Sequence, residues 1–164
     1  CISDWKCRTA PRPSKTFSNP GAETRMQTRT TEFRWPVRVY YEDTDAAGLV
    51  YHSNYLKFME RARTEWLRHL ADSQELLRNR DGIVLVVRRL DIQFMRPARI
   101  DQLLDVLARI KHCGGASLLF EQSVCDTGAE LLCSAQVEVA CIDAVTLKPR
   151  RLPEFIREEL DHVH

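Results

Sequence analysis

The stretch YYEDTDAAGLVYHSNYLKFMERARTEWLRHL, residues 40–70, contains the pattern that decides the fold. Its first half places three acids within four positions before an Ala-Ala-Gly step, which is typical of a loop. Its second half spaces apolar residues three and four positions apart, as the stripe of an amphipathic helix requires. The members of this stripe are Tyr55, Phe58, Met59, Ala62, Trp66, Leu67 and Leu70. We therefore expect a helix of roughly four turns with a buried stripe and with Ser53 or Asn54 as its N-cap.

Strand patterns lie on both sides of this stretch. Before it, Val37, Val39 and Tyr41 alternate with polar residues, which predicts a half-buried strand. After it, apolar alternation predicts four long strands, marked by residues 83–94, 104–110, 118–120 and 131–141. The continuous apolar run 83–87 is expected in a central strand. Short helices are expected at 74–78 and after Pro153.

The order of these elements predicts an α+β fold in a single domain, with one long helix packed against a five-stranded antiparallel sheet. One helix covers one face of such a sheet, so the other face and the edges invite pairing with a second copy. We expect the domain to span residues 35–158. Residues 1–34, which lack a period and contain three prolines, are expected to be a disordered leader or an N-terminal extension, with Met26 as a candidate start. Residues 159–164 are expected to be a C-terminal tail.

Composition excludes several classes of protein. The net charge is +1, of which residues 1–34 contribute +4, so the predicted domain is mildly acidic and no nucleic-acid partner is expected. The sequence has no apolar run of transmembrane length and no signal-peptide pattern, which favours a cytoplasmic location without an integral membrane segment. No CxxC motif indicates a zinc knuckle. The cysteines in predicted strands are expected to be free, buried thiols: Cys113, Cys125, Cys133 and Cys141.

Asp45 and His52, seven residues apart, bracket the expected start of the long helix. The first turn of a helix presents unpaired N–H groups and the positive end of the helix dipole, which stabilise an oxyanion. A carboxylate beside it can act as nucleophile or as general base for water, and a histidine can orient either of them. Gly48 and the alanines before it allow the backbone to approach a ligand closely. This combination is suited to acyl transfer to water.

Two other interpretations of the acidic cluster stay open. Asp-Thr-Asp before a helix is also ordinary turn and capping chemistry. A metal site is a third interpretation, with Glu42, Asp43, Asp45 and His52 as its ligands. Adjacent strand residues point to opposite faces, so Glu42 and Asp43 do not readily share one ion. We expect these two acids to serve local structure or to be solvated.

The segment RVYYEDTDAAGLVYHSNYLKFMERARTEWLR, residues 38–68, resembles the hotdog-fold acyl-CoA thioesterases of the 4-hydroxybenzoyl-CoA thioesterase family. Within this family it is most similar to the branch associated with the bacterial Tol–Pal envelope system. The resemblance extends from Trp35 to Phe155 and includes FMRPARIDQLLDV and KPRRLP, residues 94–106 and 148–153. It implies the family fold, a long helix wrapped by an antiparallel sheet.

The resemblance also implies roles for individual residues. The second Asp of the family's D-x-D-x-x-G motif is Asp45, the branch's histidine is His52, and its upstream tyrosine is Tyr41. The backbone N–H near His52 would polarise the thioester carbonyl. Ala47 stands where the branch often has a second glycine. Expected substrate-binding residues are Gly48, Ser117 within the segment 114–118, and Arg150, with Arg99, Lys148 and Arg151 as further candidates for the phosphates of coenzyme A.

By the same resemblance, the expected reaction is hydrolysis of an acyl-CoA thioester without a metal or cofactor, because coenzyme A is part of the substrate. A homodimer or homotetramer is expected, with an acyl carrier protein as a further partner. Two alternatives stay open. One is a hotdog hydratase or dehydratase acting on enoyl or 3-hydroxyacyl thioesters. The other is a non-catalytic partner of an acyl carrier or of phospholipid enzymes.

Overall fold

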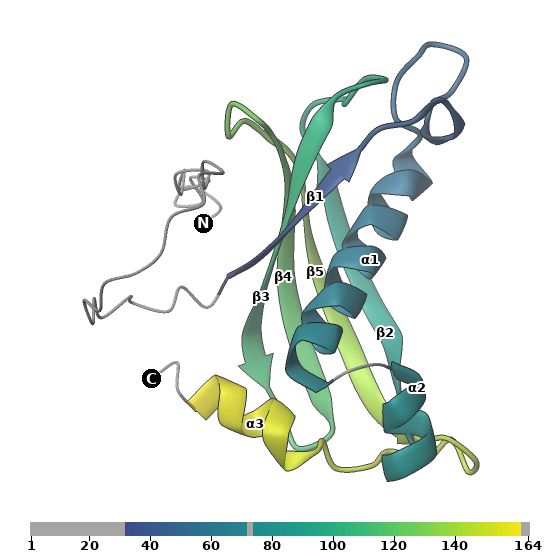
Figure 1. The fold of residues 1–164 in the computed structure, drawn as a ribbon, viewed down its shortest axis with the longest axis vertical. Coiled ribbons are helices and arrows are strands. Elements are labelled where there is room, and N and C mark those ends of the chain that lie inside the picture. The colour runs from purple at the N-terminus through teal and green to yellow at the C-terminus, as the bar shows by residue number, and fades with distance from the viewer. Residues whose placement is uncertain (1–31, 72–73, 162–164) are drawn as a thin grey trace, which may run out of the picture.

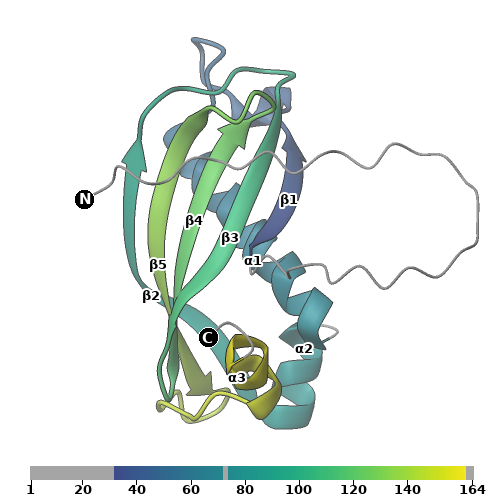
Figure 2. The same cartoon turned by 90° about the vertical axis from the view of Figure 1, so that its left-hand side faces the viewer.

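A long helix lies across one face of an antiparallel sheet in this computed structural model, which describes residues 32–71 and 74–161 (Figures 1 and 2). The five strands follow the order β1-β3-β4-β5-β2, and every neighbouring pair is antiparallel. The strands are β1 (Phe33–Arg38), β2 (Ile83–Phe94), β3 (Leu103–Cys113), β4 (Ser117–Asp126) and β5 (Leu131–Asp143). The helices are α1 (His52–Ala71), α2 (Gln74–Leu76) and α3 (Glu154–Asp161), with a 3-10 turn at Tyr41–Asp43 and a π turn at Leu77–Asp81. The predicted α+β architecture is confirmed.

The core forms between α1 and the inner face of the sheet. Phe58, Met59 and Ala62 on α1 are fully buried, which confirms the predicted apolar stripe. Opposite them, alternate residues of the strands are buried, including Val106, Phe120 and Val137. The rings of Trp66 and Phe120 meet edge to face with centroids 5.2 Å apart, a favourable geometry for an aromatic pair.

One polar contact ties α1 to the middle of the sheet. Gln122 on β4 is fully buried, and its Nε2 donates to the carbonyl oxygen of Met59 at 3.0 Å. Its Oε1 accepts a hydrogen bond of 2.6 Å from Arg63. Burial lowers the pKa of Arg63, because water no longer solvates the whole guanidinium. Apolar packing alone tolerates sliding, so this pair of directed bonds fixes which turn of α1 lies over β4.

Strand β2 corrects one prediction. The apolar run Ile83–Val87 was expected in a central strand, but β2 pairs with β5 alone and forms an edge of the sheet. Val86 and Val87 are consequently 37% and 49% exposed. A long edge strand with exposed valines is a template for pairing with another strand.

The segment between β1 and α1 corrects two more predictions. Tyr41 was expected on the buried face of the first strand with Val37 and Val39, but β1 ends at Arg38 and Tyr41 begins the 3-10 turn, where it is 84% exposed. The helix begins at His52, ahead of the expected N-caps Ser53 and Asn54. Asn54 instead directs its side-chain amide to the carbonyl oxygen of Asp43.

The chain ends and the cysteines agree with expectation in part. The short helices α2 and α3 occur where they were predicted, and both lie at the lower end of the molecule in Figure 1. Strand β1 includes Phe33 and Arg34, which were expected in the leader, and α3 includes residues 159–161, which were expected in the tail. Residues 1–31 of the expected leader and 162–164 of the expected tail lie outside the described residues. Cys133 and Cys141 are free thiols, as expected, and the thiol of Cys113 donates to the Gly114 carbonyl at 3.6 Å. Cys125 is disulfide-bonded, so the prediction of a free thiol is wrong there.

No helix within residues 32–71 and 74–161 is both long and apolar enough to span a membrane.

Replacing Phe58 by alanine tests the α1–sheet contact. Phe58 is fully buried, so Phe58→Ala should lower the free energy of unfolding by about 3–5 kcal/mol, through lost burial and a residual cavity. Urea unfolding measures the change. Lys57→Ala, on the exposed side of the same turn, is the control and should stay within about 0.5 kcal/mol of the parent. A Phe58→Ala protein that unfolds at the parent's urea concentration would contradict this assignment of the core.

Candidate active site

The loop between β1 and α1 is held at its base by Asp43. Its carbonyl oxygen accepts hydrogen bonds from the Tyr51 amide at 2.9 Å and from the Asn54 side chain at 2.8 Å. Its carboxylate accepts the Tyr40 amide at 2.9 Å. Asp43 and Asn54 are both buried. Asp43 therefore serves local structure, as expected, and it joins the start of the loop to the first turn of α1.

Asp45 lies in the loop that Asp43 anchors. Thr44 and Val50 form an antiparallel bridge, and beyond it the amide of Asp45 donates to the Leu49 carbonyl at 2.9 Å. Asp45 Oδ1 accepts the amides of Ala47 at 2.9 Å and Leu49 at 3.3 Å. Oδ2 makes no hydrogen bond within the described part of the chain, and the residue is exposed. One oxygen therefore caps the loop, and the other remains accessible to a ligand or water.

Gly48 allows this loop to turn. Its φ is +71°, a conformation that side-chain-bearing residues rarely adopt, and its amide donates to the Asp45 carbonyl at 2.9 Å. A Cβ at this position would meet no atom within 4 Å. Backbone conformation, rather than crowding, thus explains the glycine.

The start of α1 carries the second candidate, His52, in an aromatic surrounding. The His52 ring lies 4.3 Å from the Tyr51 ring and 6.5 Å from Phe94, at the end of β2. The amide N–H groups of His52 and Ser53 have no hydrogen-bond partner among the described residues. This helix end can therefore donate to an oxyanion. Within one subunit no hydrogen bond joins His52 to Asp45.

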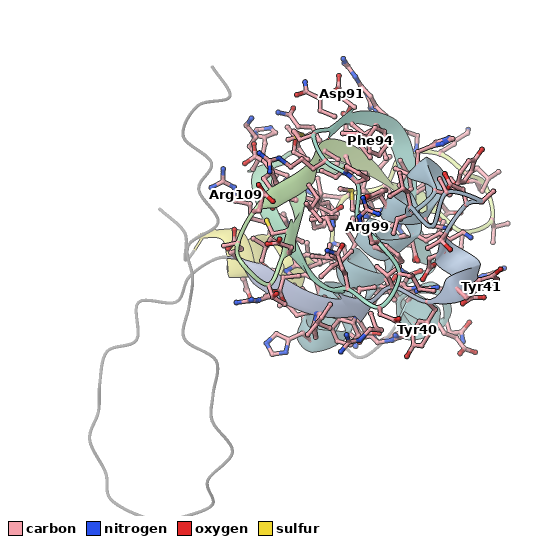
Figure 3. All side chains as sticks on the ribbon, turned by 90° about the horizontal axis from the view of Figure 1, so that it is seen from above. Tyr40, Tyr41, Asp91, Phe94, Arg99 and Arg109 are labelled. Atoms are coloured by element: carbon pink, nitrogen blue, oxygen red, sulfur yellow. The ribbon has the colours of Figure 1, made fainter. Side chains whose placement is uncertain are left out.

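Tyr41 does not join this group in the single chain. It is 84% exposed and makes no side-chain hydrogen bond to described residues. Figure 3 shows Tyr41 at the rim of the upper end, on the side away from Phe94. Arg99 lies nearer the centre of that view, and its backbone bridges Leu49 of the Asp45 loop.

Two expected substrate-binding residues lie towards the other end of the sheet. Ser117 on β4 and Val86 on β2 both pair with Ala140 of β5, one from each side. Ser117 is therefore level with Val86, which lies eight positions before Phe94 along β2. At the usual rise per residue, this is about 26 Å from Phe94. Arg150 lies near the beginning of β2, where it donates to the Gly82 carbonyl at 3.2 Å and pairs with Asp143 at 3.1 Å. Within one subunit, neither residue is brought to Asp45.

Ser117 also borders a cavity of about 310 Å³ on the outer face of the sheet. The cavity is lined by Arg89, Asp91, His112, Ser117, Leu119, Gln136 and Glu138. The further phosphate candidates Lys148 and Arg151 are exposed. Among the described residues, no group of three or more His, Cys, Asp or Glu side chains is arranged to hold a metal ion.

Sequence patterns did not indicate the part played by Tyr55 and Phe94. Tyr55 was expected only as a core residue, but its hydroxyl oxygen accepts the Ala98 amide at 2.8 Å. Burial raises its pKa, so the hydroxyl stays neutral at physiological pH. Phe94 packs edge to face on Tyr55 at 5.5 Å. Phe94 belongs to the apolar alternation of β2, but no local signal pairs it with α1.

A long helix packed against a five-stranded antiparallel sheet is the arrangement of the hotdog class of fold. In this chain an acid-bearing loop leads into the helix. The chain belongs to the thioesterase-like superfamily, whose family model matches residues 39–160. It is 48% identical to the acyl-CoA thioester hydrolase YbgC of Escherichia coli O6:H1 over 79% of this chain and 96% of that protein. It is 43% identical to the acyl-CoA thioesterase YbgC of Haemophilus influenzae, over 80% and 96%.

Solved structures agree with this assignment. A probable thioesterase from Bartonella henselae is 42% identical, with a TM-score of 0.71 over 74% of this chain and 99% of that one. Slr0204, a 1,4-dihydroxy-2-naphthoyl-CoA thioesterase from Synechocystis, is 26% identical with a TM-score of 0.74, over 81% and 98%. These matches confirm the resemblance stated from the sequence, including the Tol–Pal-associated branch, and identify the chain as a thioester hydrolase.

Removing the Asn54 amide tests how the loop is anchored. Asn54→Ala leaves the Asp43 carbonyl with the Tyr51 amide alone, so we expect a loss of about 1–2 kcal/mol in stability. Thermal and urea unfolding measure it. Ser53→Ala is the control, because the Ser53 hydroxyl bonds to none of the described residues. Equal stability of the two variants would show that the Asn54 amide does not hold the loop.

Proposed function

We propose that this chain hydrolyses acyl-CoA thioesters to coenzyme A and a carboxylic acid, with Asp45 as nucleophile or as general base. The observation that carries the proposal is the state of the Asp45 carboxylate. Oδ1 is held by two loop amides while Oδ2 is unbonded and accessible. The YbgC relatives are acyl-CoA thioesterases, which supports the choice of substrate.

The proposed reaction assigns a task to each part of the loop and helix end. The free amides at the start of α1 bind the thioester carbonyl oxygen as negative charge develops on it. Asp45 Oδ2 attacks the carbonyl carbon, or removes a proton from a water that attacks it. The carbon–sulfur bond then breaks, and the thiolate of coenzyme A takes up a proton, which in the water route comes from Asp45. In the nucleophile route, water next hydrolyses the acyl–Asp45 anhydride, which releases the carboxylic acid and restores the carboxylate. His52 orients the carboxylate or the water.

We further propose that the working site forms between two copies of the chain. Strand β2 exposes its outer edge and two valines, and a second β2 can pair there in antiparallel fashion. Antiparallel pairing about the middle of β2 sets the Phe94 end of one strand beside the Ile83 end of the other. The Ser117 and Arg150 end of one subunit then lies near the Asp45 and His52 end of its partner.

Replacing Asp45 by asparagine tests the chemistry without disturbing the loop. Asparagine keeps an oxygen for the Ala47 and Leu49 amides but has no negative charge, so folding should be preserved. Turnover should fall about 10³-fold or more, measured as thiol release over short, long and aromatic acyl-CoAs. His52→Ala should lose less if the histidine orients rather than reacts. Near-parent thiol release by Asp45→Asn would exclude the carboxylate as the essential group.

Charging the β2 edge tests the assembly. Near the middle of β2, a two-fold axis would bring the two copies of residue 87 together, so Val87→Asp places like charges side by side. We expect the mass by light scattering to fall to that of a monomer, and activity to be lost with it. Arg61→Asp is the control, because Arg61 is exposed in the middle of α1, away from β2 and from the Arg150 end, and its replacement should leave mass and activity unchanged. A Val87→Asp protein with the parent's mass and activity would overturn the proposed interface.

A further inference from the structure

Three aromatic rings connect the core to the start of α1. Tyr55 and Phe94 meet edge to face with centroids 5.5 Å apart, and Phe94 presents its ring to His52 at 6.5 Å and 81°. Phe94 is the last residue of β2, and it is 49% exposed. Its ring therefore rests on one side against Tyr55 and borders His52 and solvent on the other.

The inner end of this ring series is fixed. Tyr55 is 3% exposed, its hydroxyl oxygen accepts the Ala98 amide at 2.8 Å, and its ring also contacts Phe58 at 6.3 Å. A ring held at its edge and its tip cannot change rotamer without breaking a buried hydrogen bond. Phe94 packs on this fixed surface, and the pairing of Phe94 with Cys133 holds its backbone.

The outer end of the series has no comparable anchor. The His52 imidazole makes no hydrogen bond within the described residues, so within one subunit its ring neighbours are the contacts that can set its orientation. Those neighbours are Tyr51, which is half-exposed, and Phe94, which is supported by Tyr55. An edge-to-face contact of this kind stabilises one ring orientation by about 0.5–1.5 kcal/mol.

We infer that Phe94 is a positioning residue that holds the His52 imidazole in one orientation at the mouth of the site. This inference rests on the proposed function, in which His52 orients the reacting carboxylate or water. Phe94 acts through His52 and takes no part in the bonds that form and break during the reaction. Its loss should therefore lower the fraction of enzyme with a correctly oriented imidazole, which reduces kcat, and should leave substrate binding nearly unchanged.

The test combines kinetics with a double-mutant cycle. Phe94→Ala should lower kcat about 3–10-fold, the range that follows from the energy of one edge contact, with KM within about two-fold of the parent. Phe94→Tyr keeps the ring and should restore kcat. In a His52→Ala background, Phe94→Ala should have no further effect, because the residue through which it acts is gone. Met95→Ala is the control: Met95 is 41% exposed and adjacent in sequence, but is not part of the ring series.

A spectroscopic measurement separates failure of this inference from failure of the proposed function. The His52 ring resonances in NMR spectra should shift in Phe94→Ala and stay in place in Met95→Ala, whether or not any acyl-CoA is hydrolysed. A parent protein inactive on all acyl-CoAs would overturn the proposed function and leave this result standing. Additive losses in the double mutant, a raised KM with unchanged kcat, or unshifted His52 resonances in Phe94→Ala would each overturn the positioning role.

Discussion

The structure depends on the burial of one sheet face beneath α1. That helix presents a broad apolar stripe, and the inner sides of the strands supply the matching surface. Apolar contact decides that the two layers pack, but it does not by itself decide their register. Gln122 adds the missing specificity, because its two directed bonds to α1 are satisfied in one alignment only. The start of α1 is consequently fixed beside the end of β2.

This alignment determines the shape of the loop that carries Asp45. The chain leaves β1 at Arg38 and has to reverse before it can enter α1, so it forms a narrow loop closed by the Thr44–Val50 bridge. Asp43 ties the base of the loop to α1 from below, and Gly48 supplies the one backbone conformation that the turn requires. A carboxylate on such a loop is exposed to solvent, but its position is fixed by the loop backbone. This is the combination that a reacting group needs.

The sequence predicted the helices and strands better than it predicted which of them lie next to one another. The helix and the strands were found because local periodicity reports which side of an element is apolar. It does not report strand order, so the run Ile83–Val87 was read as central although β2 lies at an edge. Asn54 was expected as an N-cap because the local sequence does not show a more distant partner. Its side-chain amide bonds instead to the Asp43 carbonyl, eleven residues away. Asp45 and His52 could be selected from motif and chemistry, whereas the contact between His52 and Phe94 arises only when β2 and α1 are brought together.

The edge position of β2, which the sequence did not predict, also points to the reason why this strand is apolar. An apolar strand is suited to burial, and at an edge it becomes buried only when something else covers it. In the proposed dimer the cover is a second β2, whose antiparallel direction joins ends of the molecule that one subunit keeps about 26 Å apart or more. Burial of the strand and completion of the site then have the same cause. A chain that evolved to protect its edge in this way would acquire a cleft between subunits, with Asp45 and the start of α1 on one side and the Arg150 end of the partner subunit on the other.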